Sequence, residues 1–420
     1  MHLPDEFYQL EKTIAKYLSE LRPAQRTGLC LWVMGAVLAQ SACQNAVITA
    51  LLAYGGFHTL RQYLREWLYD GADRAAPCSV QLEVSHCFAP LLRWLLSWWQ
   101  GKEIALAIDA TTHHDKLTAL VVSVLYEGCA IPVAWHIMPG EQPGEWLGPI
   151  VQMLHKIQDV IPPSWRVIVL ADRGLWSPCI WHEIRECRFH PVMRIQNHSV
   201  FQPRGQQIVP AKSLVKPGTA WTGRGRAFSD SHSRLEATLM MLWGEGQQEP
   251  WAVLTDLAPE DVGVCWYGLR IWIELGFRAF KGLGWQWERT RRVDPERVSR
   301  HWLVMAVATL WVLAYGTRME EQVEDRTIRK AMEDAMKQWP GSADSTSQNT
   351  PMPRSEQRDR RQVSLFRLGL LTFARQILRG RPWKRLFLYP EPWPEAMPGV
   401  QFLTRAPPDN ELTRRPYLPL

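Results

Sequence analysis

The chain has 420 residues, of which 46% are hydrophobic and 21% charged, enough for two or three domains around a sizeable buried core. Its net charge of +6 permits nucleic-acid binding without requiring it. The eight cysteines are scattered, the N-terminal sequence is acidic and polar, and the longest apolar run, Trp302 to Tyr315, is too short to span a bilayer. These features argue against a disulfide framework, a signal peptide and a membrane span, so we expect a cytoplasmic protein without membrane contact.

Residues 1–100 are predicted to form an all-helical domain, because apolar side chains recur there at helical spacing. Gly55 and Gly56 separate a long helix from a shorter basic helix that carries Arg61 and Arg65. Helix, glycine turn and basic helix are the outline of a DNA-binding helix-turn-helix, although any two packed helices give the same outline. The predicted helices are Asp5–Leu21, Thr27–Tyr54, His58–Tyr69 and Phe88–Gln100.

Residues 101–197 are predicted to begin an α/β core, because short apolar runs alternate with amphipathic segments. Three consecutive strands predict an antiparallel meander, and the later alternation of helix and strand predicts a mixed sheet. The predicted strands are Ile104–Ile108, Leu117–Tyr126, Ile131–Ile137, Val167–Ala171 and Pro191–Ile195, and the predicted helices are Glu145–Val160 and Pro178–Glu186.

Two aspartates, Asp109 and Asp172, each follow directly on an apolar strand. That edge of an α/β sheet is where such folds place their functional sites. A single aspartate at a strand end is more often a helix cap or a turn residue. Two of them, each followed by small or turn-forming residues, favour a functional pair.

Residues 198–258 are predicted to form a β-rich insertion between Asp172 and the next helix, because strand-like runs there are separated by Gly, Pro and Ser turns. The predicted strands are Gln206–Val215, Thr219–Phe228, Leu235–Trp243 and Trp251–Asp256.

The segment Tyr267–Lys281, YGLRIWIELGFRAFK, has no proline and is predicted to be one α-helix. At about 100° per residue, Arg270, Glu274 and Lys281 fall within roughly 60° of its first residue, with Arg278 beside them. A solvated face with an i,i+4 ion pair explains the charges. A face that holds a metal and grips phosphates also explains the single carboxylate among several phosphate-binding groups. Under both interpretations Arg270 and Lys281 lie at the surface.

Residues 259–330 are predicted to complete the core with this helix and a long apolar helix, Pro295–Met319. Residues 331–420 are predicted to form a linker and a basic, Pro-rich tail. Within them, 339–360 has the composition of a disordered linker and Leu365–Leu378 that of a short helix. The chain beyond about residue 385 is not expected to contribute to a core.

The three acids Asp109, Asp172 and Glu274 can converge if the two strands and the helix belong to one α/β fold. Carboxylate oxygens are hard ligands that suit Mg²⁺ or Mn²⁺. Two such ions can activate a nucleophile and stabilise the leaving oxygen at a phosphodiester. The sequence therefore predicts a metal-dependent phosphodiester chemistry.

The helix reads Tyr-x2-Arg-x3-Glu-x6-Lys, with Tyr267, Arg270, Glu274 and Lys281 at the four positions. This pattern resembles the DDE transposases of bacterial insertion sequences, in the group defined by that signature. The motif IDATT contains Asp109 and is similar to the first aspartate motif of the family, and VIVLADRG contains the second aspartate. The resemblance covers about residues 104–315.

The resemblance implies a ribonuclease H-like core and two divalent metal ions held by Asp109, Asp172 and Glu274. It implies endonuclease cleavage at the ends of an insertion sequence, followed by cut-and-paste strand transfer into target DNA. The expected partner is double-stranded DNA, bound by a homodimer in the bacterial nucleoid. The expected DNA-binding residues are Tyr267, Arg270, Arg278 and Lys281 near the cleaved bond and Arg61 and Arg65 in the helical domain.

Some members of this group cut the second strand through a hairpin while an aromatic side chain holds a flipped base. Trp243, Trp251 and Trp272 are the candidates for that role, and packing is the commoner role for such residues. Two alternatives to an active transposase stay open. One is a catalytically idle or domesticated DNA-binding relative, and the other is an unrelated hydrolase that uses paired carboxylates.

Overall fold

The computed structural model describes residue 3 and residues 5–69, 82–140, 145–230, 234–322, 363–380, 385–396 and 401–402. The predicted linker at 339–360 and the C-terminal residues 403–420 lie outside this set. Within the described residues, the strands form one mixed sheet of eleven strands with helices packed against it. The chain is therefore an α/β protein, as its sequence pattern predicts.

The sheet has the order β3-β2-β1-β4-β5-β10-β9-β8-β6-β7, and β11 pairs with β8. β1, β2 and β3 form the predicted antiparallel meander, whereas β1, β4 and β5 are parallel neighbours. The strands are β1 (Glu103–His113), β2 (Leu117–Tyr126), β3 (Cys129–Pro139), β4 (Arg166–Ala171), β5 (His190–Arg194), β6 (Val200–Pro203), β7 (Val209–Pro210), β8 (Thr219–Ala227), β9 (Leu235–Trp243), β10 (Trp251–Thr255) and β11 (Gln401–Phe402).

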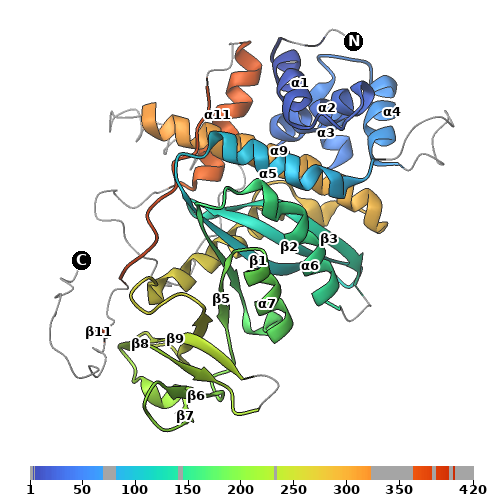
Figure 1. Ribbon diagram of the computed structural model, residues 1–420. Coiled ribbons are helices and arrows are strands. Elements are labelled where there is room, and N and C mark those ends of the chain that lie inside the picture. The colour runs from blue at the N-terminus through green and yellow to red at the C-terminus, as the bar shows by residue number, and fades with distance from the viewer. Residues whose placement is uncertain are drawn as a thin grey trace.

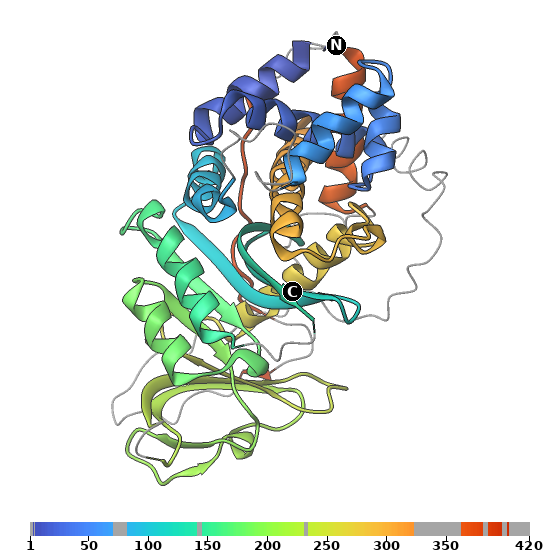
Figure 2. The same cartoon turned by 90° about the vertical axis from the view of Figure 1, so that its right-hand side faces the viewer.

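Helices α1–α5, α9 and α11 gather toward one end of the molecule and the β6–β9 strands toward the other (Figure 1). Turned by 90°, the view shows α6 and α7 on one side of the β1–β3 strands and α8 and α9 on the other (Figure 2). Because it is covered on both faces, β2 is buried almost along its whole length and reads as a continuous apolar run. The helices are α1 (Asp5–Tyr17), α2 (Pro23–Ala39), α3 (Gln44–Leu51), α4 (Phe57–Leu68), α5 (Phe88–Trp98), α6 (Leu147–Ile157), α7 (Pro178–Glu186), α8 (Ile271–Phe280), α9 (Pro295–Gln322) and α11 (Leu365–Arg379).

The prediction of a single helix over Thr27–Tyr54 is wrong. The chain bends by 89° between α2 and α3. Gln40 ends α2 in the left-handed conformation, with φ of 49°. Just beyond it, the amide of Ala42 donates to the carbonyl of Trp285 at 2.7 Å. A tertiary hydrogen bond thus replaces the helical one that a continuous helix would make.

The basic segment before and within α9 docks the N-terminal helices. The guanidinium of Arg300 is fully buried and donates to the carbonyl of Leu68 at 2.6 Å. The Nε2 of His301 donates to the carbonyl of Ala42 at 2.8 Å, and burial holds the pKa of that imidazole well below its ordinary value. These contacts tie α2–α4 to the segment that follows α8.

The β-rich segment extends the main sheet, because β10 pairs with β5 and β9 in antiparallel register. The prediction of a strand over Gln206–Val215 is wrong. That stretch holds the two-residue strand β7 and a 3-10 turn, Ala211–Leu214. Pro210 has no amide to donate to a ladder, which limits the strand.

The segment 385–396 packs on the core, so the expectation that the chain beyond 385 adds nothing to a core is wrong. Leu388 is fully buried, accepts from the amide of Gln100 and donates to the carbonyl of Trp98. The ring of Trp393 meets that of Trp266 at 4.7 Å between centroids. The residues that make these contacts alternate with exposed residues and prolines, so the composition of the segment does not predict them.

α9 is long and apolar enough to cross a bilayer by length and composition alone, but 89% of its apolar window is buried within the protein. It packs against α11, where the backbone of Gly369 lies so close to the Val312 carbonyl that a Cβ would approach that oxygen within 1.8 Å. A side chain at this position would therefore separate the two helices.

We expect Leu388→Ala to lower the free energy of unfolding by about 2–5 kcal/mol, because it removes a fully buried leucine. Leu378→Ala is the matched control, since Leu378 is 71% exposed and should change stability by less than about 0.5 kcal/mol. Urea denaturation of the full chain measures both values. Equal stabilities of the two variants would show that the segment 385–396 does not belong to the core.

Candidate active site

The pairing of β1 with β4 brings Asp109 and Asp172 side by side. The two strands are parallel, and their last paired residues are Ile108 and Ala171. Asp109 and Asp172 are the next residues on neighbouring strands, which lie about 4.8 Å apart in a sheet. Asp109 does not end its strand as predicted, because β1 continues beside β2 as far as His113. The aspartate stands where β1 leaves β4 and remains paired with β2.

The prediction of one α-helix over Tyr267–Lys281 is also wrong in part. A 3-10 helix, Val264–Arg270, precedes α8, and Lys281 leaves the helical conformation. The predicted alignment of Tyr267, Arg270 and Glu274 on one face is still present. Side chains three apart are aligned in a 3-10 helix, which places Tyr267 with Arg270. Side chains four apart are neighbours in an α-helix, which places Arg270 with Glu274.

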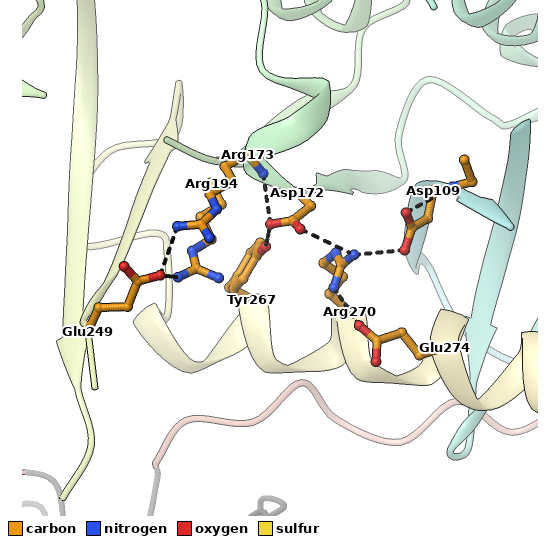
Figure 3. Close-up of polar contacts among 9 residues, drawn as sticks. Asp109, Asp172, Arg173, Arg194, Glu249, Tyr267, Arg270 and Glu274 are labelled. Atoms are coloured by element: carbon orange, nitrogen blue, oxygen red, sulfur yellow. Dashed lines mark hydrogen bonds and ion pairs between the residues drawn. The ribbon is translucent and has the colours of Figure 1, made fainter. Parts of the chain in front are cut away.

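The guanidinium of Arg270 lies among all three predicted acids (Figure 3). Its Nη2 is 2.7 Å from Oδ2 of Asp109 and 3.6 Å from Oδ2 of Asp172. Its Nη1 is 2.8 Å from Oε1 of Glu274. Three carboxylates from two strands and a helix thus converge on one cationic group, with a formal charge of −2 in total.

Burial shapes the electrostatics of this cluster. It raises the pKa of Asp109, and Asp172 and Glu274 raise it further, against the opposing effects of Arg270 and the Ala110 amide. Burial opposes the charge of Arg270, yet Asp109 and the other acidic groups hold the pKa of its guanidinium above the ordinary value. The site therefore concentrates negative charge that needs a cation.

Arg270 was expected to lie at the surface as a DNA-binding residue, and the expectation that it is exposed is wrong. Its side chain is only 15% exposed. The reason is electrostatic: three carboxylates in a partly desolvated site attract the nearest cation, and the 3-10 turn points Arg270 at them. Arg278 is exposed, as a residue that meets a large ligand must be. Lys281 is half-buried, and burial lowers the pKa of its amine against the opposing charge of Glu288.

Tyr267 is buried, and its hydroxyl donates to Oδ1 of Asp172 at 3.3 Å. Burial raises the pKa of this phenol above its ordinary value. Of the three tryptophans proposed to hold a flipped base, Trp251 packs its ring edge-to-face on Tyr267 at 5.3 Å. Trp243 instead donates to Gln247 in its own turn. Trp272 lines a small hollow together with residues of the segment 385–396. It is two residues away from both Arg270 and Glu274, which places it on another side of the helix.

Sequence reasoning missed three residues beside the acids. The Oε1 of Glu249, in the connection between β9 and β10, accepts from Nη1 of Arg173 at 2.8 Å and from Nη2 of Arg194 at 2.9 Å. Arg173 follows Asp172 in the chain, and that adjacency was the only signal available. Glu249 and Arg194 are brought to the site by the pairing of β10 with β5, which no local pattern encodes.

Arg61 and Arg65 lie on the exposed side of α4, outside the acidic cluster. The guanidinium of Arg65 lies 4.7 Å over the ring of Tyr69. Phe57 lies four residues before Arg61 on the same side of the helix and is exposed as well. The structure therefore presents a basic and aromatic helix face that is separate from the three acids.

The donor chemistry of the cluster fits Mg²⁺ or Mn²⁺, which take carboxylate oxygens. Asp109, Asp172 and Glu274 are the residues that would hold such ions. In the arrangement described here, Arg270 stands between them, and no group of three or more His, Cys, Asp or Glu side chains among the described residues is spaced to hold one ion. An ion that took all three acids as ligands would have to displace the guanidinium.

Residues 149–311 match the family model described as the transposase DDE domain. The matched stretch includes Asp172 and Glu274 and begins after Asp109, so the match does not bear on the first acid. A solved structure, described as a cryo-EM structure of the piggyBac transposase synaptic complex with hairpin DNA, aligns with 80% of this chain and 84% of its own chain. The identity is 10% and the TM-score 0.33, a likeness too weak to carry an argument. No curated protein matches the chain.

We expect Arg270→Ala to lower the free energy of unfolding by about 1–3 kcal/mol at neutral pH, because it leaves three carboxylates without their shared cation. Arg278→Ala, on the exposed side of the same helix, is the control and should change it by less than about 0.5 kcal/mol. Thermal unfolding with and without Mg²⁺ measures the effect. The ion should stabilise the Arg270 variant more than the wild type, since it supplies the lost positive charge.

The loss in the Arg270 variant should also depend on pH. The folded-state pKa of Asp109 is raised, so protonation of this carboxyl favours the folded chain. Arg270 lowers the pKa of Asp109 against the effect of burial, so its loss raises that pKa further. The destabilisation should be full above the pKa of Asp109 in the variant and should shrink as the pH falls from there to the wild-type pKa. A loss that stays constant on acidification would contradict repulsion among the acids as its cause.

Proposed function

We propose that this chain is a DDE transposase that cleaves DNA at the ends of an insertion sequence and joins those ends to target DNA by cut-and-paste transposition. The observation that carries the proposal is the meeting of Asp109, Asp172 and Glu274 around one guanidinium. The match of residues 149–311 to the transposase DDE domain supports the same reading independently. The exposed arginines near the acids and on α4 support DNA as the substrate.

The chemistry consists of two transfers at phosphorus. In the first, water attacks a phosphodiester at the end of the element, the P–O3′ bond breaks, and a 3′-hydroxyl and a 5′-phosphate are released. In the second, that 3′-hydroxyl attacks a phosphodiester of target DNA, forms a new bond to phosphorus and displaces another 3′-hydroxyl. Neither transfer requires a redox partner.

Divalent ions bound to the three acids supply charge stabilisation and nucleophile activation in such chemistry. This chain's own residues prepare the site for it. The Tyr267 hydroxyl orients Asp172 by hydrogen bonding to it, and the Ala110 amide does the same for Asp109. Arg270 gathers the three acids by ion pairing and opposes the rise in the pKa of Asp109. If divalent ions were held by the acids instead, its guanidinium would be available to contact a DNA phosphate.

The fold fits this assignment. The order β3-β2-β1-β4-β5, with three antiparallel strands followed by two parallel ones, supports the ribonuclease H-like core that the signature implies. The α2–α4 helices, with the 89° bend between α2 and α3, support a DNA-end-binding role for the N-terminal part. A homodimer on DNA in the bacterial nucleoid completes the proposal.

Two other functions make different predictions. A catalytically idle relative would bind the DNA ends and not cut them, whereas a carboxylate-based hydrolase of another class would not bind DNA at all. The ion-pair cluster favours an active enzyme over the idle relative, since a purely DNA-binding protein has no need to gather three partly desolvated carboxylates.

We expect the purified chain to cleave labelled duplexes that carry the DNA flanking its own gene when Mg²⁺ or Mn²⁺ is present. Asp109→Ala and Glu274→Ala should each lower the rate by at least roughly 100-fold, because each removes a group that acts at the reacting phosphate. Asp159→Ala is the control, since that side chain is 85% exposed and remote from the cluster, and its rate should match the wild type. A denaturing gel separates the products and reveals any hairpin.

Full cleavage by the Glu274 variant would contradict its assignment as the third acid. Binding without cleavage in either metal would favour the idle relative.

We expect the double substitution Arg61→Ala with Arg65→Ala to weaken DNA binding at all sequences. If each side chain meets one phosphate, the slope of log affinity against log salt should become shallower by about 0.9 for each arginine. Arg188→Ala, which removes another exposed arginine far from α4, is the control. An unchanged slope in the double variant would exclude α4 from the DNA interface.

A further inference from the structure

Glu249 links the β9–β10 connection to the edge of the acidic cluster. One of its oxygens accepts hydrogen bonds from Arg173 and Arg194 at 2.8 and 2.9 Å (Figure 3). Its side chain is 42% exposed, whereas that of Arg194 is 16% exposed. A single carboxylate thus sets the direction of two guanidiniums, one from the turn that follows β4 and one from the end of β5.

Both arginines lie beside the acid Asp172. The backbone amide of Arg173 donates to Oδ1 of Asp172 at 2.8 Å, and Tyr267 donates to the same oxygen. Arg194 is close enough to Tyr267 for its charge to lower the pKa of the phenol, against the larger effect of burial. The pair therefore borders the place where the reacting phosphate is expected.

The charges explain why the carboxylate is needed. With Glu249, the three groups carry a net formal charge of +1, next to the −2 of the acidic cluster. Without it, Coulomb attraction from the neighbouring Asp172 would compete for these guanidiniums. Glu249 competes for both guanidiniums and uses few of their donors, since an arginine has five N–H groups.

We propose that Glu249 is a positioning residue that holds Arg173 and Arg194 as a pair for one phosphate of the DNA backbone beside Asp172. This inference rests on the proposed function and assigns a role in the site to the β-rich segment that carries Glu249. A planar, forked guanidinium is suited to phosphate oxygens, and two held at a fixed angle lose less rotamer freedom on binding than two free ones.

The test is a double-mutant cycle on the full chain with labelled duplex carrying the DNA that flanks its gene. Glu249→Gln keeps the shape and removes the charge, and it should weaken binding about tenfold, or about 1.4 kcal/mol. Arg194→Gln should weaken it to a similar extent. The variant with both substitutions should lose less than the sum of the two single losses, because the glutamate acts in part through this arginine and in part through Arg173.

The matched control is Glu103→Gln, which breaks another exposed arginine–glutamate pair, with Arg166 at 3.3 Å, elsewhere on the sheet. Its DNA affinity should equal that of the wild type. Thermal unfolding distinguishes the proposed positioning role from a purely structural one. Under a purely structural role, Glu249→Gln would lower the melting temperature and leave the DNA affinity unchanged. That result, or independent losses in the cycle, overturns the proposal while wild-type binding stands. A wild type that binds no DNA overturns this proposal and the proposed function together.

Discussion

The arrangement of the site depends on one electrostatic constraint, the gathering of three carboxylates around Arg270. Bringing Asp109, Asp172 and Glu274 together in a partly buried place costs free energy that a guanidinium at 2.7–3.6 Å offsets. The same attraction removes Arg270 from the surface. One side chain is therefore the shared counter-charge of all three acids, at the place where a divalent ion would be held.

The sheet sets the positions of two of the three acids. β1 pairs in parallel with β4 as far as Ile108 and then continues beside β2, so Asp109 is held by strand pairing on one side only. Its carboxylate faces Arg270, as does that of Asp172 (Figure 3). Asp172 begins a turn, and its side chain accepts a hydrogen bond from the amide of Arg173. The rigid strands fix both acids, and the 3-10 turn before α8 brings Tyr267 and Arg270 to face them.

Two segments that the sequence pattern places outside the core are in contact with it. The β-rich stretch joins the main sheet through β10 and carries Glu249 to two arginines beside Asp172. The segment 385–396 packs Leu388 and Trp393 against the body of the protein. In both cases the determining contacts link residues far apart in the chain, so neither composition nor periodicity reveals them.

The sequence by itself determined most of the strands and predicted the three acids, because apolar periodicity, aspartates that follow apolar runs and the spacing of Arg270 and Glu274 are local patterns. The strands of the meander, helix α7 and the spacing that aligns Arg270 with Glu274 all follow from such patterns. Only the tertiary structure decided where helices break and which charges meet. The bend after Gln40, the burial of Arg270 and the partners of Glu249 depend on hydrogen bonds and ion pairs between distant segments, and these exist only once the sheet has assembled.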